Sequence, residues 1–354
     1  MELKNFKDSI IIITGGAGFV GSNLTTRLLD FDVKKIVIVD NLLSAEPINI
    51  PDSNKIQFIL GSITDDKVLS QLPKETDYVF HLVTYHGNQS SIVDPIADHE
   101  NNTFSTLKLL ESIKNFKNLK AVVYSSAGCT IAKKTYDDVE ATTEDAPVSL
   151  YLDSPYQISK IIGEFYGNYY FMKHNVPFIK ARFQNVYGPG EILGAGRWRG
   201  TQATIWRNVV PTFIWKAINK EPLPVENGGM ATRDFIYVSD IVEGLVKCAL
   251  LGRPGGIYNL ASGIEISIKE TAELINKLTG NPANIELKPA RNWDRSGKRY
   301  GDTSKSFNEI NFKTEIDFED GLKKTVEWTK SNYEIIQQCI NKQKILMEKL
   351  FNET

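Results

Sequence analysis

A tyrosine and a lysine four residues apart are the side chains in this sequence best suited to acid–base chemistry. Tyr156 and Lys160 belong to the segment YQISK, within residues 155–174, whose pattern predicts one long helix. Residues four apart lie on one face of a helix, so the phenol and the ammonium reach the same ligand. A neighbouring positive charge stabilises a phenolate, which makes Tyr156 a candidate base near neutral pH. Because this spacing is also common on helix surfaces, the pair needs a second feature in support.

That second feature is a glycine-rich turn near the start of the chain. The segment ITGGAGFVGSN, residues 13–23, follows a run of isoleucines and precedes apolar residues at helical spacing. Gly15, Gly18 and Gly21 recur at three-residue intervals. Glycines permit a tight turn and close backbone approach, while a helix N-terminus offers free N–H groups and the positive end of its dipole. Strand, glycine turn and helix in this order predict a site for the pyrophosphate of a dinucleotide.

A carboxylate at the end of the second predicted strand indicates which dinucleotide binds. Asp40 follows the glycine turn by about twenty residues, where a carboxylate accepts hydrogen bonds from the ribose hydroxyls and repels a 2′-phosphate. The sequence therefore predicts NAD rather than NADP, the alternative being a structural Asp40 that caps a turn with Asn41. The predicted cofactor-binding residues are Gly15, Gly18, Phe19, Val20, Gly21, Asp40, Asn41, Ser62, Ile63, Leu82, Tyr156 and Lys160.

The first half of the sequence alternates predicted strands with predicted helices. Strands are expected at 10–14, 35–40, 56–60, 78–82, 121–125 and 178–183, with long helices at 97–115 and 155–174. Such alternation indicates βαβ units and a parallel sheet covered by helices on both faces. We therefore predict an α/β fold, a Rossmann-type doubly wound parallel sheet with a smaller C-terminal α/β substrate-binding lobe.

The character of the chain changes after Gly188, where residues 189–234 become rich in Gly, Pro, Trp and Arg. We expect a dinucleotide-binding domain over 1–185 and a second lobe mainly over 186–330, with some segments returning to the first domain. A C-terminal helix is expected over 331–354, within an amphipathic pattern that begins near residue 320 and suits packing or an oligomer contact.

Composition argues against several classes of partner and location. The 354 residues carry a formal net charge of −2, which disfavours nucleic acid or an anionic membrane as the main partner. Cys129, Cys248 and Cys339 lack the spacing of a metal site, and so few cysteines are typical of a reducing compartment. Neither a signal peptide nor an apolar stretch of transmembrane length is found. We expect a cytoplasmic protein without a bound metal.

Together these motifs resemble the extended short-chain dehydrogenase/reductase family, in its NAD-dependent nucleotide-sugar epimerase/dehydratase branch. The similarity covers roughly residues 9–330 and includes the segments VFHL at 79–82, SIVDP at 91–95, YSS at 124–126, RFQNVYGP at 182–189 and RDFIYVSD at 233–240. It implies a tightly held NAD that takes a hydride from a sugar carbon, usually C4, and returns it later. It also implies a homodimer formed through helices near 97–116 and 155–174.

Two positions depart from the pattern of that branch. The branch usually has Ser or Thr at the position of Ala127, where the hydroxyl bonds the reacting sugar oxygen, and Ser126 is the candidate replacement one residue earlier. The 4,6-dehydratases carry an Asp–Glu pair where this chain has Gly128 and Cys129, which disfavours dehydration by the usual acid. GDP-mannose 3,5-epimerases place an acid–base cysteine at the Cys129 position. Cys129 is therefore either a candidate catalytic residue or a small core residue.

The resemblance also assigns three residues to a nucleotide-diphosphate sugar. Asn185 matches a position that contacts the phosphate or the sugar, Arg233 matches the usual diphosphate arginine, and Arg299 resembles the second one. Arginine suits phosphate because its planar fork forms two parallel hydrogen bonds. Structural salt bridges are the alternative for both arginines.

Three further residues are candidates for the sugar pocket. Thr84 and His86 follow the fourth predicted strand, at the end of the sheet where this fold binds ligands. Arg199 belongs to an unusual insertion, 194–200, that we expect to form a mobile loop over the sugar. A hydrogen-bonded structural His86 and a solvated surface loop are the alternatives.

These residues predict an NAD-dependent nucleotide-sugar epimerase, acting at C4 of a UDP-hexose or related sugar, with GDP as the alternative nucleotide. Tyr156 would remove the proton of the C4 hydroxyl, and the resulting ketone would rotate before its reduction on the other face. The alternatives are a 4,6-dehydratase, a 4-dehydrogenase that releases NADH, or 3,5-epimerase-like chemistry using Cys129. A non-catalytic NAD sensor on the same fold is disfavoured, because a sensor has no need of a base.

Overall fold

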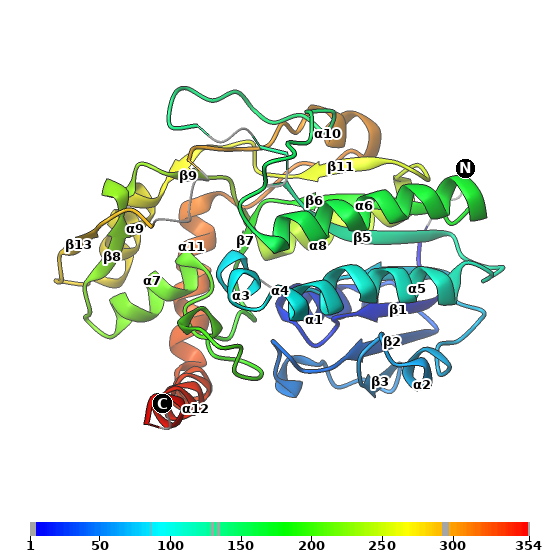
Figure 1. Ribbon diagram of the computed structural model, residues 1–354, viewed down its shortest axis with the longest axis horizontal. Coiled ribbons are helices and arrows are strands. Elements are labelled where there is room, and N and C mark those ends of the chain that lie inside the picture. Colours follow the sequence, from blue (N-terminus) through cyan, green and yellow to red (C-terminus); the bar gives the residue numbers. More distant parts are fainter. Residues whose placement is uncertain (1–4, 86, 129–130, 133–134, 292–296, 353–354) are drawn as a thin grey trace.

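The structure is a computed structural model that describes residues 5–352, apart from residue 86 and residues 129–130, 133–134 and 292–296. Its main unit is a seven-stranded sheet in the order β11-β6-β5-β4-β1-β2-β3 (Figure 1), and every pairing in it is parallel. These strands are β1 (Ile10–Thr14), β2 (Lys35–Asp40), β3 (Ile56–Leu60), β4 (Tyr78–His81), β5 (Ala121–Ala127), β6 (Phe178–Phe183) and β11 (Ile257–Leu260).

The central strands are buried on both faces because helices cover the sheet from both sides. The five residues of β1, IIIIT, are all buried, as expected for a parallel strand inside an α/β fold. On one face α1 (Phe19–Leu29) and α8 (Val238–Leu251) share a hydrophobic core with the sheet. On the other face the core includes residues of α2 (Asp66–Leu69), α5 (Ser105–Ile113) and α6 (Pro155–His174). The doubly wound parallel sheet predicted from the sequence is therefore confirmed.

A second lobe lies beside the carboxyl ends of the strands (Figure 1). It surrounds its own hydrophobic core and contains three two-stranded pairs, β7 with β10, β8 with β13 and β9 with β12. The strands are β7 (Asn185–Tyr187), β8 (Leu223–Glu226), β9 (Thr232–Arg233), β10 (Phe235–Tyr237), β12 (Ile266–Ser267) and β13 (Ile285–Lys288). The α-helices of the described residues that have not yet been given, in either part of the molecule, are α3 (Asn88–Val93), α4 (Pro95–Asp98), α7 (Val209–Ile218), α9 (Ile268–Thr279), α10 (Ser304–Ile310), α11 (Phe318–Ser331) and α12 (Tyr333–Asn352).

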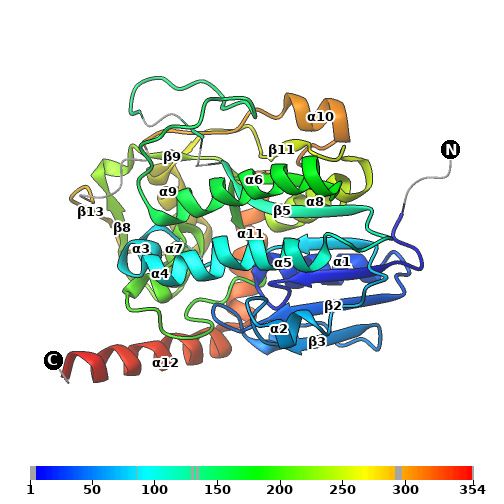
Figure 2. The same cartoon turned by 45° about the vertical axis from the view of Figure 1, so that its right-hand side comes forward.

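Two predicted helices are interrupted. The helix expected over 97–115 contains a π-helical turn, His99–Phe104, between α4 and α5. The pattern beginning near residue 320 forms two helices, because Asn332 turns its backbone out of the helical region and its side-chain Nδ2 donates to the Trp328 carbonyl oxygen. As a result α12 leaves the direction of α11, and its C-terminal end projects from the body of the molecule (Figure 2). None of the described helices is both long and apolar enough to cross a membrane.

Candidate active site

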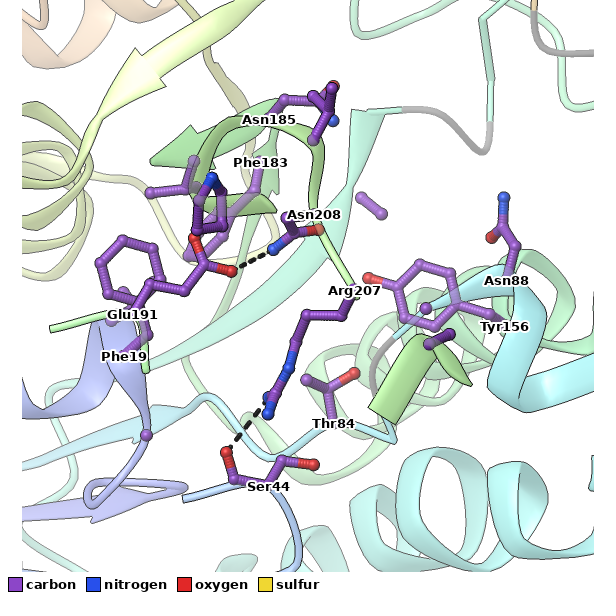
Figure 3. Close-up of a pocket in the computed structure, with 18 of the residues that line it drawn as sticks. Phe19, Ser44, Thr84, Asn88, Tyr156, Phe183, Asn185, Glu191, Arg207 and Asn208 are labelled. Atoms are coloured by element: carbon purple, nitrogen blue, oxygen red, sulfur yellow. Dashed lines mark hydrogen bonds between the residues drawn. The ribbon is translucent and has the colours of Figure 1, made fainter. Parts of the chain in front are cut away.

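A cavity of about 820 Å³ lies between the carboxyl ends of the sheet strands and the second lobe. Its wall is formed by the turn after β1, the ends of β2, β4 and β5, the start of α6 and several segments of the second lobe (Figure 3). Every predicted site residue that the structure describes lines this cavity, with the exception of Arg199. His86 and Cys129 lie outside the described residues. Residues far apart in the sequence are thus gathered around one space, while their roles remain predictions.

The glycine turn forms the floor of the cavity and requires glycine at two of its positions. Gly15 has a φ of +77°, and a Cβ atom there would lie 2.9 Å from the backbone of Leu82 on β4. A Cβ on Gly21 would collide with the Gly15 carbonyl oxygen. Gly18 is the N-cap of α1 and provides no side-chain hydrogen bond to the first turn of the helix. The N–H groups at the start of α1 therefore face the cavity as donors for an anion.

Asp40 closes the strand next to this turn, and backbone groups fix its carboxylate. Oδ2 accepts a hydrogen bond from the Ala17 amide at 3.1 Å, and Oδ1 accepts one from the Leu42 amide at 2.8 Å. Burial raises the pKa of Asp40, and the backbone hydrogen bonds oppose that rise. Each carboxylate oxygen keeps acceptor capacity for a hydroxyl group. The side chain is therefore placed and oriented to bind a diol beside the glycine turn.

Helix α6 carries the phenol and the ammonium into the cavity from the opposite side. The helix starts at a defined residue, because the Ser154 side chain caps it and Pro155 occupies its first position. Tyr156 directs its hydroxyl into the cavity (Figure 3). Lys160, only 2% exposed, donates from Nζ to the carbonyl oxygen of Ser125 at 2.9 Å, and its Nζ lies 5.9 Å from the centre of the Tyr156 ring. The predicted pair therefore shares one face of the helix, with the positive charge buried behind the phenol.

Ser126 lines the cavity, but its hydroxyl is bonded elsewhere. Its Oγ donates to Glu164 Oε1 at 2.5 Å. Glu164 in turn forms a bidentate ion pair with Arg182, with both N···O distances 2.8 Å and both side chains nearly inaccessible to solvent. For Ser126 to take the place of a hydroxyl at Ala127, this hydrogen bond would have to break. The role of Ser126 remains a prediction, and the observed geometry does not favour it.

His81 is a buried histidine at the end of β4 whose surroundings make it a structural residue. Its Nδ1 lies 2.7 Å from Thr14 Oγ1, and its Nε2 lies 2.9 Å from Thr106 Oγ1. Burial, followed by the charge of Lys160, lowers the pKa of His81 to about 3. The ring is therefore neutral and joins β1, β4 and α5 behind the cavity.

The second lobe contributes cations to the far wall of the cavity. The Arg233 guanidinium donates to the carbonyl oxygens of Thr232 and Gly297 at 2.6 and 2.9 Å. Arg299 Nε is buried without a hydrogen-bond partner. Asp234 accepts hydrogen bonds from Gly301 and Gly263 as well as from Ser262, so one buried carboxylate ties together the loops that carry these arginines. Asn185 and Thr84 also line the cavity.

Arg199 differs from the expectation that it faces the sugar. It is 5% exposed, its Cζ lies 5.6 Å from the centre of the Tyr85 ring, and it is not among the residues that line the cavity. The loop around it is also held in place, because the Arg197 amide donates to the Leu43 carbonyl oxygen at 3.0 Å. Glu46 accepts from the amide of Gly196 at 2.9 Å. The insertion therefore packs on the segment after β2 instead of forming a free flap over the sugar.

Among the cavity residues that sequence reasoning missed are Glu191, Arg207 and Asn208 (Figure 3). Asn208 donates from Nδ2 to Glu191 Oε1. Burial raises the pKa of Glu191 to about 7, against a smaller opposing effect of Asn208 and the Arg207 charge. The concentration of arginine and tryptophan in 189–234 was the available signal, but it did not indicate which of the arginines reaches the cavity.

Comparison with known proteins identifies the family of this chain. The NAD dependent epimerase/dehydratase family matches residues 11–261. The chain belongs to this family. The structure of the enzyme WbmF from Bordetella bronchiseptica, in complex with NAD+ and UDP, is 55% identical with a TM-score of 0.88, covering 96% of this chain and 98% of that one. Two further WbmF structures contain NAD+ or NADH. The cofactor of the present chain, a member of this NAD-dependent family, is therefore NAD.

The curated relatives include proteins named for each of the two reactions in the family's name, epimerisation and dehydration. A putative UDP-glucose 4-epimerase of Methanocaldococcus jannaschii is 28% identical over 91% of this chain and 99% of its own length. A dTDP-glucose 4,6-dehydratase of an Actinoplanes species is 27% identical over 91% of this chain and 98% of its own length. The chain is therefore an NAD-dependent enzyme of the nucleotide-sugar epimerase and dehydratase class.

The residues present fit NAD as the cofactor of this epimerase/dehydratase. Polar atoms that are buried and have no hydrogen-bond partner within the protein line the cavity: Ser44 Oγ, Thr84 Oγ1, Glu191 Oε2, Arg207 Nε, Thr212 Oγ1 and Arg299 Nε. Such groups are costly to bury unless a ligand or water satisfies them. The glycine turn and the start of α1 would hold the pyrophosphate and Asp40 a ribose, and Tyr156 and Lys160 would lie at the reactive end.

Proposed function

We propose that this enzyme is a nucleotide-sugar epimerase that acts at C4 of a UDP-hexose or a related UDP-sugar. The observation that carries the proposal is that Tyr156 and the buried Lys160 share a cavity with Asp40 on one side and with Arg233 and Arg299 on the other. The expected dinucleotide site and the expected diphosphate site would then lie on either side of one candidate base. UDP is favoured because the similar WbmF structure contains UDP and an epimerase relative is named for UDP-glucose.

In the proposed mechanism the protein orients the sugar and moves one proton. Bound NAD supplies the hydride chemistry, taking a hydride from C4 and returning it. The Tyr156 phenolate, stabilised by the Lys160 ammonium, takes the proton of the C4 hydroxyl as the carbonyl forms. After the keto sugar has rotated to present its other face, the same phenol gives the proton back to the oxygen. Arg233 and Arg299 hold the diphosphate as an anchor about which the sugar rotates.

Dehydration and net oxidation are the second candidates, because the relatives include 4,6-dehydratases and because Ala127 lacks a hydroxyl. Both reactions would begin with the same ketone, so they differ from epimerisation in what happens next. Gly128 occupies one of the two positions where the dehydratases carry their acid pair, which favours epimerisation.

A panel of UDP-, GDP-, dTDP- and CDP-sugars, followed by NMR with NADH absorbance in parallel, tests the proposal. We expect a C4 epimer from a UDP-sugar without net NADH. A 6-deoxy-4-ketosugar, or stoichiometric NADH, would replace the proposal with the dehydratase or the dehydrogenase. Tyr156→Phe is expected to retain NAD and lose turnover by a factor of about 10² to 10⁴. Tyr151→Phe, an exposed phenol in the segment that precedes the same helix and outside the cavity lining, is the matched control.

We also propose that the enzyme is a homodimer formed through the face that carries α5 and α6, which lie side by side (Figures 1 and 2). This face exposes large apolar side chains, namely Ile92, Val93, Ile96, Phe104, Ile158, Phe165, Tyr169 and Met172. An apolar surface of this kind favours association. Light scattering is expected to give the dimer mass for the wild type and the monomer mass for Phe165→Glu combined with Met172→Lys. Met230→Lys, exposed elsewhere, should leave the dimer intact.

We also propose a cytoplasmic location. The two described cysteines, Cys248 and Cys339, are free thiols, as is typical of a reducing compartment, and the proposed substrates are activated nucleotide sugars. Fractionation of the native host is the direct test, and recovery of the enzyme outside the cytoplasm would contradict the proposal.

A further inference from the structure

Arg207 reaches across the cavity and is bonded to both parts of the molecule (Figure 3). It precedes α7 in the second lobe. Its Nη1 donates to the Ser44 carbonyl oxygen at 3.2 Å, and its Nη2 donates to the Ala195 carbonyl oxygen at 3.0 Å. Ser44 belongs to the segment that follows Asp40, the candidate ribose ligand. The side chain therefore bridges the second lobe and the cofactor side of the cavity.

Arg207 lines the cavity, and its guanidinium has donors without a partner inside the described part of the protein. Although Arg207 as a residue is partly exposed, its Nε is buried and has no hydrogen-bond partner. An arginine carries five N–H donors, of which the two carbonyl oxygens use two. Burial is the main cause that lowers the pKa of this group, and the charge of Glu191 only partly opposes it. A buried guanidinium with free donors is costly unless an anion compensates it.

The surroundings indicate which anion this is. Glu191 and Phe19 both line the cavity (Figure 3), and Phe19 is the first residue of α1. A Cβ on Gly190, which precedes Glu191, would lie 3.6 Å from the Phe19 ring. The segment that leads to Arg207 thus packs directly against the helix N-terminus that is expected to hold the dinucleotide pyrophosphate.

The same segment is fastened from behind by α12. Gln343, fully buried, donates from Nε2 to the carbonyl oxygens of Gly194 and Gly196 at 2.9 and 2.8 Å. Lys342 forms an ion pair with Glu46 at 2.6 Å, in the segment after β2 that Arg207 also contacts. Residues 191–207 therefore form a strap, anchored at both sides of the cavity, with Arg207 at its end.

We propose that Arg207 is a cofactor-retaining residue, which closes this strap over the bound dinucleotide and gives its free N–H donors to the pyrophosphate. The two negative charges of the pyrophosphate would then be shared between the start of α1 and a guanidinium from the other lobe. Release of NAD would require both the phosphate contacts and the hydrogen bond from Arg207 to Ser44 to break. The inference rests on the cofactor position proposed above and does not depend on which sugar is the substrate.

The test measures cofactor release rather than turnover. Holoenzyme carrying radiolabelled NAD is chased with excess unlabelled NAD, and the bound label is followed by rapid gel filtration. Arg207→Met is expected to raise the release rate about thirtyfold, as the loss of a buried charged contact does. Arg197→Met is the matched control, because Arg197 is exposed and also bonds a backbone oxygen of the same segment, at Asn41; its release rate should change less than about twofold.

NAD release from Arg207→Met at the wild-type rate would overturn the proposal. If that variant also showed a large loss of UDP affinity by calorimetry, the guanidinium would belong to the substrate diphosphate instead. If Arg207→Met does not fold, Arg207→Lys replaces it, and we expect at least about fivefold faster release because an ammonium lacks the fork; a wild-type rate again overturns the proposal. Failure of the sugar panel, together with the expected faster release of NAD from Arg207→Met, would refute only the proposed reaction.

Discussion

Lys160 on α6 and Ser125 on β5 are joined by a hydrogen bond of 2.9 Å from the ammonium to the backbone carbonyl oxygen. The ammonium also lies 5.2 Å from the centre of the Tyr124 ring and 5.9 Å from that of Tyr156. Because the carbonyl group belongs to a central strand, the sheet fixes the position of the positive charge beside the phenol. The catalytic proposal therefore depends on the packing of α6 against β5 as much as on the spacing of the two residues.

Replacing this ammonium should disable proton transfer without unfolding the enzyme. Lys160→Met is expected to lower kcat by a factor of about 10² to 10⁴ and to shift the acidic limb of the pH profile to higher pH, because the phenolate loses its positive neighbour and its pKa rises. The pH dependence of kcat measures both effects. Lys173→Met, an exposed lysine on the same helix, should match the wild type. An unchanged pH profile in Lys160→Met would contradict the proposed role.

The carboxylate at the end of β2 should select NAD over NADP. Asp40→Ala removes an acceptor of ribose hydrogen bonds and the charge that repels a 2′-phosphate. We expect NAD affinity to fall at least about tenfold, the effect of losing a charged hydrogen bond, while the preference for NAD over NADP narrows. Titration of both dinucleotides by calorimetry measures this. Asp52→Ala, in an exposed part of the following loop, should bind both like the wild type, and unaltered selectivity in Asp40→Ala would refute the assignment.

The buried pair Glu164–Arg182 should be a determinant of stability. Its side chains are 6% and 4% exposed, so Glu164→Gln leaves a buried guanidinium without its counter-charge. Breaking a buried ion pair costs about 3–5 kcal/mol, which urea unfolding of the holoenzyme should show as a lower midpoint. Lys323→Met disrupts an exposed pair with Asp320 and is expected to leave the midpoint unchanged. Equal midpoints for all three proteins would contradict this interpretation.

Glu191 should make cofactor retention sensitive to pH. Burial raises its pKa from 4.5 to about 7, and Arg207 is the charged neighbour that opposes the rise. Below this pKa the carboxyl is neutral; above it a negative charge lies near the expected pyrophosphate. NAD release should therefore quicken between about pH 6 and pH 8, and Glu191→Gln should release NAD at a rate that does not change over this range. A wild-type release rate that is independent of pH would count against this position for the pyrophosphate.

The raised pKa of Glu191 also makes the free energy of unfolding depend on pH. The unfolded chain gives up the Glu191 proton near the ordinary value of 4.5, whereas the folded protein keeps it up to about 7. The folded state therefore binds more protons in this window, so this group makes the free energy of unfolding fall as the pH rises from 4.5 toward 7.

The regular parts of the fold were predictable because their signals are local. Runs of buried β-branched residues predicted strands such as Ile10–Thr14 and Lys35–Asp40, and the structure has both with these bounds. The glycine turn was recognisable for a similar reason, since Gly15 adopts a positive φ and Gly21 packs against the backbone. A buried parallel strand and a glycine turn can each be recognised from the residue types within a few consecutive positions.

The strap was not predictable because long-range contacts determine its conformation. Nothing in the spacing of 189–208 indicates that Arg199 lies over Tyr85 while Arg207 enters the cavity. That choice depends on hydrogen bonds to Leu43 and Ser44 and on Gln343, nearly 150 residues away. The sequence shows only that arginines are concentrated in this segment, and it does not show where each arginine lies.

The most direct test of the central claim is the fate of the hydrogen at C4. The nucleotide sugar that the panel identifies as substrate is prepared with deuterium at C4 and incubated with the holoenzyme in ordinary water, and the product is examined by NMR. Transfer of a hydride to NAD and back, with Tyr156 handling only the hydroxyl proton, predicts an epimer that retains its deuterium at C4. Replacement of that deuterium by hydrogen from water would contradict the account.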